Sequence, residues 1–229
     1  MNILHTIFTF LAGAALFWSG TESLHAQVTS FQIDEAKIDR GLARQLDSIL
    51  LEDQQCRLEW NKLRKSGASA SRIDSLKNKI IEIDKSNLAF IERLLGEYGW
   101  LGPQQVGFQA SQAVFLVIQH AGLATQKKYY PLIRQAEEAG KILSSDVAIL
   151  EDRIAVREGR EQLYGSQGHY DDRTKKVYIY PLQDVENLDS LRKSRGLSPM
   201  SDYIKGWSVA DYNHYLPVAR TFLENEREK

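Results

Sequence analysis

Hydrophobic residues at helical spacing dominate the chain after its N-terminal segment. From Asp34 to Lys65 the apolar positions recur at alternating steps of four and three residues, which places them on one face of an α-helix. A second series of the same kind runs from Ile73 to Leu94, after the Gly/Ser-rich segment 66–71. Two such helices joined by a short loop predict an antiparallel helical hairpin.

Three further helices are predicted in the middle of the chain. Residues Ala110–Ala121 are apolar nearly all round, which is typical of a buried central helix. Helices over 125–139 and 144–157 follow, and Gly140 and Gly159 are suitable residues to end them. These helices would form a bundle around the central one.

The last third of the chain changes character. Residues 162–167 and 177–180 flank a polar turn, a pattern that favours a small β-hairpin. Short helices are expected over 188–193 and 200–207, and the charged residues 224–229 read as a frayed end. We therefore expect a mainly α fold, in which an antiparallel helical hairpin packs on a central helical bundle, with a small β-hairpin near the C-terminal third.

The N-terminal segment predicts export. Ile7–Trp18 is an apolar run too short to span a bilayer comfortably but suited to a signal peptide, and Ala26 is a small residue at a suitable cleavage position. We expect residues 1–26 to be a signal peptide and 27–229 a single mostly helical domain, periplasmic or secreted. Because Met1–Thr6 contains no Lys or Arg, an uncleaved segment holding the protein in the membrane is the alternative. No later run is long enough to span a membrane.

Composition and charge exclude several classes of function. The chain is 43% apolar and 26% charged, which is ordinary for a globular protein and too apolar for a disordered one. With 29 basic and 30 acidic side chains, it has no long-range field to attract nucleic acid. Cys56 is the only cysteine, so no intramolecular disulfide is possible, and its helical context indicates a small buried hydrophobic residue.

Four polar residues interrupt faces that the apolar pattern would bury. Asp53 and Asn87 occupy seam positions of the two hairpin helices, and Gln119 and His120 end the central helix. Counting outward from the loop places Asp53 and Asn87 within about one helical turn of each other. A buried polar group left unpaired costs about 1–3 kcal/mol. These side chains should therefore form a paired network, with Arg57 pairing with Asp53 at i,i+4, or line a pocket.

A series of short motifs in the chain resembles a known bacterial family, the domain of unknown function 6624. The family is marked by a QHA, a DR and a Q-x-Y-G-T-Q segment in this order, and the corresponding residues here are Gln119–Ala121, Leu150–Arg153, Gln162–Gln167, and Arg192 with Arg195–Leu197. Asp53–Gln54 with Arg57, Asp84 with Asn87, and Tyr98–Trp100 fit as well. The resemblance covers roughly 47–203.

The chain departs from the family pattern at two places. Ser166 stands where the family usually has Thr, and Leu101–Pro103 replaces a Trp-Pro junction. Members of the family are often exported, and no activity is known for them. The resemblance therefore implies where a site lies without naming its chemistry.

His120 is the strongest candidate for proton transfer, because an imidazole at the end of an apolar helix can be tuned across neutral pH. Asp152 is its expected orienting carboxylate, which makes His120 and Asp152 the candidate catalytic residues. Arg153 could bind a carboxylate or phosphate, although Asp152 and Arg153 could equally be a surface ion pair. The candidate ligand-binding residues are Asp53, Arg57, Asn87, Gln119, Arg153, Gln162, Tyr164 and Gln167.

Metal and cofactor chemistry find little support in the sequence. There is no H-E-x-x-H motif, no closely spaced His/Cys cluster and no glycine-rich phosphate loop, so we expect no metal and no cofactor. Two hypotheses remain. Either a His-containing polar pocket binds, or binds and hydrolyses, a small polar or cell-envelope-derived molecule, or the chain is a non-catalytic envelope protein whose polar motifs form a structural network. The sequence names no protein partner.

Overall fold

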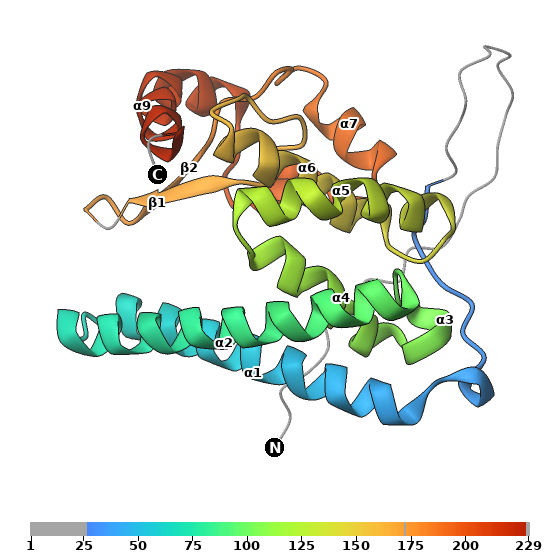
Figure 1. The fold of residues 1–229 in the computed structure, drawn as a ribbon. Coiled ribbons are helices and arrows are strands. Elements are labelled where there is room, and N and C mark those ends of the chain that lie inside the picture. The colour runs from blue at the N-terminus through green and yellow to red at the C-terminus, as the bar shows by residue number, and fades with distance from the viewer. Residues whose placement is uncertain (1–26, 172, 228–229) are drawn as a thin grey trace, which may run out of the picture.

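The fold is mainly helical, in two layers joined by one crossing helix. The structure, a computed structural model, describes residues 27–171 and 173–227 (Figure 1). The segment predicted to be a signal peptide, 1–26, lies outside the described residues. In the described part of the chain, no helix is both long enough and apolar enough to cross a membrane.

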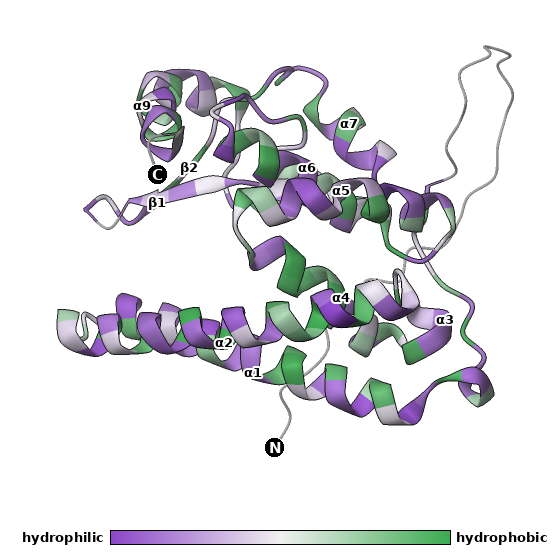
Figure 2. Ribbon diagram, viewed as in Figure 1, coloured by the Kyte–Doolittle hydropathy of each residue, from purple (hydrophilic) through white to green (hydrophobic). Residues whose placement is uncertain are grey.

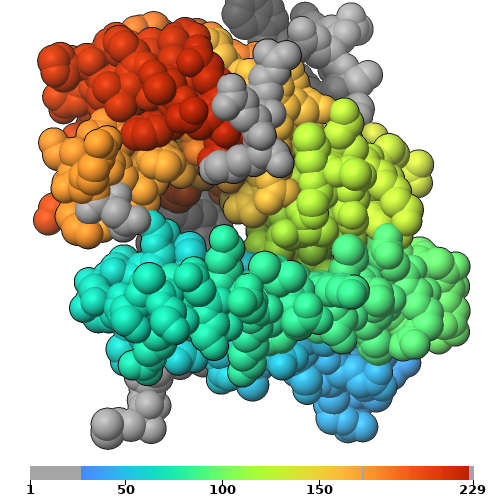
Figure 3. Space-filling model, turned by 60° about the vertical axis from the view of Figure 1, so that its left-hand side comes forward, coloured from blue at the N-terminus to red at the C-terminus, as the bar shows by residue number. Residues whose placement is uncertain are grey.

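The predicted helical hairpin is confirmed. It consists of α1 (Arg40–Lys65) and α2 (Ala70–Tyr98), which form the arm that runs below the β-hairpin and the C-terminal helix in Figure 3. The expected start at Asp34 is wrong, because Glu35–Lys37 forms a separate 3-10 turn, η1. Asp39 starts α1 instead, since its side chain accepts a hydrogen bond from the backbone N–H of Leu42 at 2.9 Å.

The predicted central helix is also confirmed. After the short α3 (Pro103–Val106), α4 (Phe108–His120) runs from the α1–α2 layer to the layer that contains α5 (Leu123–Glu138) and α6 (Ser144–Arg157) (Figure 1). Figure 2 shows hydrophobic residues along much of this helix. The apolar α4 side chains buried in the main core are Ala110, Ala113, Val114, Phe115, Val117 and Ile118.

The C-terminal third adds the small β-hairpin and three helices. Strand β1 (Gly168–Asp171) pairs antiparallel with β2 (Lys176–Ile179), with Gly168 opposite Ile179. The helices are α7 (Leu188–Ser194), α8 (Met200–Tyr203) and α9 (Val209–Arg227). A second core lies here, built from the buried side chains of Ile179, Leu182, Leu188, Met200 and Tyr212.

Three details of this region differ from the sequence prediction. Residues 162–167 form a loop rather than the first strand, which begins at Gly168. The helix expected over 200–207 ends at Tyr203. The end expected to fray is helical to Arg227 within α9, despite Pro217 in its interior. Packing explains this last difference, because the buried side chains of α9 hold the helix against the cores.

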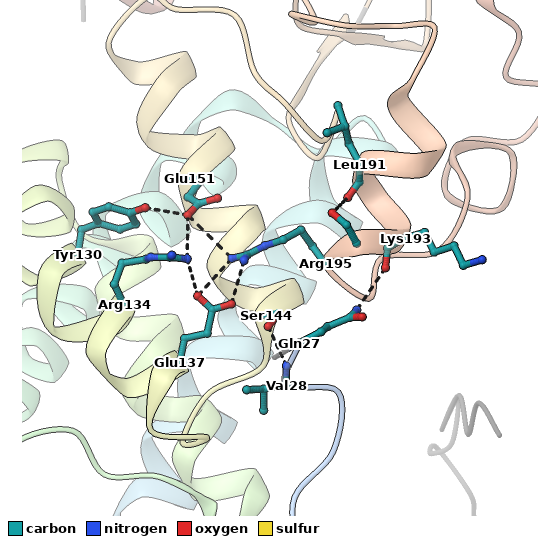
Figure 4. Close-up of polar contacts among 11 residues, drawn as sticks. Gln27, Val28, Tyr130, Arg134, Glu137, Ser144, Glu151, Leu191, Lys193 and Arg195 are labelled. Carbon is teal, nitrogen blue, oxygen red and sulfur yellow. Dashed lines mark hydrogen bonds and ion pairs between the residues drawn. The ribbon is translucent and has the colours of Figure 1, made fainter. Parts of the chain in front are cut away.

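Charged side chains tie α5 and α6 to the loop after α7 (Figure 4). Glu137 of α5 pairs with Arg134 at 2.5 Å and with Arg195 at 3.0 Å. Glu151 of α6 accepts a hydrogen bond from the hydroxyl of Tyr130 at 2.7 Å and lies 3.5 Å from Arg134. Two arginines thus face two glutamates, so the charges of this cluster balance, and its role is to hold the elements together.

Asp146 makes the stability of the fold depend on pH. It lies in the first turn of α6, where burial raises the pKa of its carboxyl to about 6, although Gln112 donates a hydrogen bond to it at 3.0 Å. In the unfolded chain, the ordinary pKa of an aspartate is 3.8. Below about pH 4 the carboxyl is protonated in both the folded and the unfolded state, so its burial costs no stability. As the pH rises to 6, only the unfolded state ionises, and the free energy of unfolding falls by about 3 kcal/mol.

We expect Asp146→Asn to remove this loss, because the amide stays neutral and its oxygen still accepts from Gln112. The stability of the variant relative to the parent should rise by about 3 kcal/mol between pH 4 and pH 8, as measured by chemical denaturation at each pH. A difference between the two proteins that stays constant over this range would contradict the prediction.

Candidate functional site

His120 meets a buried carboxylate at the C-terminal end of α4. Its Nδ1 lies 3.1 Å from Oδ1 of Asp53, which projects from α1. The side chain of Asp53 is 3% exposed and that of His120 is 14% exposed. Among the described residues, no hydrogen bond reaches Nε2 of His120. One ring nitrogen is thus held by Asp53, and the other has no hydrogen bond to any described residue.

Asp53 is kept ionised by its partners. Burial by itself raises the pKa of its carboxyl, but hydrogen bonds and charges from His120 and Arg57 outweigh burial and hold the pKa at about 2. Nε of Arg57 donates to Asp53 at 3.1 Å, which confirms the predicted i,i+4 pair. Nη2 of Arg57 also reaches Asp84 of α2 at 2.5 Å, and Gln54 donates to Asp53 at 2.7 Å.

Asn87 and Gln119 are buried, as their positions on the apolar faces predict. Nδ2 of Asn87 is buried without a hydrogen-bond partner. The backbone carbonyl of Gln119 accepts from the side chain of Gln126 at 2.6 Å and from Nη1 of Arg153 at 3.3 Å. The contacts recorded for Gln119 therefore fix the end of α4.

Two arginines of α6 lie on either side of His120 along the α4 backbone. Arg153 donates to the carbonyl of Gln119, and Arg157 donates to that of Ala121 at 2.6 Å. Nε of Arg153 is buried without a partner. Burial, together with the positive charges of Arg157 and Arg57, lowers the pKa of Arg153 to about 10. Two arginines therefore contact the backbone on either side of His120.

Asp152 lies apart from His120, contrary to its expected role. Its carboxylate accepts hydrogen bonds from the backbone N–H groups of Leu163 at 2.8 Å, Tyr164 at 3.0 Å and Ser166 at 2.9 Å. Burial raises the pKa of Asp152, and these three N–H groups act against the rise. Neighbouring residues of an α-helix point about 100° apart, so Asp152 faces this loop while Arg153 faces α4. The carboxylate beside His120 is that of Asp53.

The other predicted ligand-binding residues form the loop that Asp152 holds. Gln162 is fully buried; its Nε2 donates to the carbonyls of Gln167 at 2.9 Å and Tyr180 at 3.0 Å, and its Oε1 accepts from the N–H of Gln167. The carbonyl of Tyr164 accepts from Arg192 at 2.6 Å, and burial raises the pKa of the Tyr164 phenol to about 12. The hydrogen bonds of these residues stabilise the loop, and none of them reaches His120.

Three residues that contact the network around His120 or the loop held by Asp152 were not in the predicted site. Asp84 shares a motif with Asn87 in the family resemblance, which could have indicated it. Arg157 follows Arg153 by four residues and so lies on the same helix face. Tyr203 has no signal in the sequence, because only the fold brings it to the loop, where its hydroxyl donates to the carbonyl of Ser166 at 3.0 Å.

Two pockets occur among the described residues. One of about 750 Å³ is lined by residues 27–32, Gln104, Glu137, Glu138 and Gly140, and the lining of one of about 500 Å³ includes Asp152, Tyr130, Glu151 and Arg160. His120 lines neither of them. Within 27–171 and 173–227, no group of three or more His, Cys, Asp or Glu side chains could hold a metal ion.

Asp152→Asn should destabilise the fold strongly. An asparagine amide places an NH₂ group against backbone N–H donors that the carboxylate now accepts, so at least one donor is left unpaired. We expect a loss of at least about 2 kcal/mol in the free energy of unfolding, measured by urea denaturation. The exposed Asp202→Asn is the matched control. If both variants unfold like the parent, the structural role of Asp152 is wrong.

Comparison with known proteins gives a family and no activity. The model of a family of unknown function, DUF6624, matches residues 42–213, a range that includes His120, Asp53 and both α6 arginines. No curated protein and no solved structure matches the chain.

Proposed function

The chain belongs to this family of unknown function, and we propose that it binds a small polar molecule beside His120 and hydrolyses it by general acid–base catalysis. The observation that supports this is the contact between Nδ1 of His120 and the buried, ionised Asp53 at 3.1 Å, with Nε2 left without a protein partner. A carboxylate on one nitrogen fixes the tautomer that leaves the other nitrogen as a base.

In this mechanism Nε2 takes a proton from a water molecule that attacks the bound substrate. The water oxygen forms the new bond, the bond to the leaving group breaks, and the imidazolium returns its proton to that group. Asp53 stabilises the imidazolium, because its charge lies against Nδ1. The guanidinium of Arg153 would stabilise negative charge that develops on the substrate.

The location of the substrate follows from the expected export of the chain. If residues 1–26 direct secretion, the molecules that meet the site are those of the cell envelope. We therefore propose a small polar compound derived from the envelope as the substrate. This part of the proposal depends on the signal peptide and is independent of the chemistry at His120.

A non-catalytic structural network is the second candidate. It is favoured by the hydrogen bonds of Arg153 and Arg157 to the last carbonyls of α4, which are the contacts expected of a helix C-cap. In that case Asp53 and His120 only join α1 to α4, and the contact through Nδ1 is the whole role of the imidazole.

One variant of His120 separates the candidates. In His120→Asn the amide nitrogen replaces Nδ1 as a donor to Asp53, and Nε2 is lost. We expect His120→Asn to keep the melting temperature of the parent within a few degrees, since it retains the donor. It should lose all hydrolysis of envelope sugars, peptides and nucleotides, which mass spectrometry of a compound library detects.

The exposed His214→Asn on α9 is the control and should behave as the parent in both assays. If the parent and His120→Asn convert the same compounds, or the parent converts none, catalysis by His120 is wrong and the structural network remains. If His120→Asn alone loses conversion while it melts like the parent, the network interpretation is excluded.

A further inference from the structure

Two arginines beside the proposed site have no anionic partner. Nη1 of Arg153 lies 3.3 Å from one α4 carbonyl, and Nη1 of Arg157 lies 2.6 Å from another. Among the described residues, neither arginine forms an ion pair. A guanidinium carries five N–H donors, so each has most of its donors uncommitted.

The neighbouring arginines differ from this pair. Arg195 also has a buried Nε without a partner, but its charge is matched by Glu137 at 3.0 Å (Figure 4). Arg57 is matched by two aspartates. Arg192 is 1% exposed, donates to two carbonyls and lies over the ring of Tyr203. Arg153 and Arg157 are therefore the two arginines at the end of α4 that have no carboxylate of a described residue within ion-pair distance, although the charge of Glu226 acts on Arg157.

We propose that Arg153 and Arg157 bind the phosphate group of a ligand, an inference that rests on the proposed function and names the class of molecule that His120 acts on. The two residues are four apart in α6, so their side chains leave the same face of the helix. A carboxylate has two oxygens and is satisfied by one guanidinium fork. A phosphate offers at least three oxygens and up to two negative charges, which suits two forks that lie side by side.

Other charges also act on the pair, and the negative charge of Glu226, which acts on Arg157, opposes an anion there. The C-terminal end of α4 carries a partial negative charge of about half a unit, which opposes an anion, but two full guanidinium charges exceed it. Asp53 also lies nearby, and its charge is taken up by Arg57 and His120. Tyr203, which is 49% exposed, donates its hydroxyl proton to the carbonyl of Ser166.

Arginine NMR signals test the site in the unaltered protein. Inorganic phosphate is titrated into the full chain at constant ionic strength, and the Nε–H signals of the arginines are followed. We expect saturable shifts for Arg153 and Arg157 and none for Arg195, whose Nε is equally buried but whose charge is matched. If Arg153 does not move, or all arginines move together without saturation, the proposal is wrong.

A set of variants then measures the contribution of each fork by calorimetry. Removing one charged donor group should weaken phosphate binding about ten- to a hundredfold in Arg153→Gln and in Arg157→Gln. The surface Arg220→Gln, whose partner is Glu161 at 2.9 Å, is the matched control and should bind phosphate as the parent does. If Arg153→Gln fails to fold, Arg157→Gln and the NMR titration still decide the question. Unchanged affinity in Arg157→Gln would overturn the proposal.

Two further binding measurements identify the source of the phosphate. A sugar phosphate monoester that binds more tightly than inorganic phosphate supports a phosphorylated ligand, and equal or weaker binding supports the free ion. Acetate should fail to compete, and competition by acetate at equal concentration would refute the preference for phosphate.

The inference and the proposed function can fail separately. If phosphate binds at Arg153 but no compound is converted by a reaction that depends on His120, the anion site is supported and catalysis is rejected. If the protein converts an unphosphorylated compound by a reaction that depends on His120 but does not bind phosphate, the anion site is rejected and catalysis is supported.

Discussion

A single buried carboxylate joins the helical hairpin to the central helix. Asp53 of α1 contacts His120 of α4 and Arg57 of its own helix, and Arg57 carries the link on to Asp84 of α2. Removing a carboxylate from water costs several kcal/mol unless opposite charges and hydrogen bonds compensate. Because the hydrogen bonds of its partners keep Asp53 ionised, the geometry of three helices and the orientation of the imidazole depend on the same group.

Two groups of charged side chains in the fold differ in whether each charge has an opposite partner. In the cluster of Glu137, Glu151, Arg134 and Arg195 the numbers of opposite charges match, and each charge has a partner within 4 Å. At the end of α4, Arg153 and Arg157 contact only carbonyl oxygens among the described residues, and the charge of Glu226 acts on Arg157 from beyond ion-pair distance. A cluster whose charges are paired has no need of a ligand, whereas a half-buried guanidinium without a carboxylate partner favours an anion from solution. This contrast is the physical basis for placing a site at one cluster and not at the other.

Periodicity predicted most of the fold because hydrophobic burial drives most of its elements. The hairpin, the central helix and α6 all follow from apolar spacing, and α6 has the predicted bounds. Where long-range packing decides, local pattern failed. Residues 162–167, expected to form a strand, are a loop held by Asp152, and α9 persists past Pro217 because its buried face packs on the cores.

The same distinction explains which parts of the site the sequence could indicate. Asp53 and His120 stand out because each interrupts an apolar face, and the i,i+4 rule pairs Arg57 with Asp53. Which carboxylate meets His120 depends on how α1, α4 and α6 pack, and no local rule contains that information. Asp152 and Arg153 are adjacent in the sequence, yet the turn of the helix directs one to the loop and the other to α4. Asp152 and Arg153 are therefore neighbours in one motif but have different roles: Asp152 holds the loop, and Arg153 contacts the end of α4. This difference follows from the packing of the helices and not from the motif.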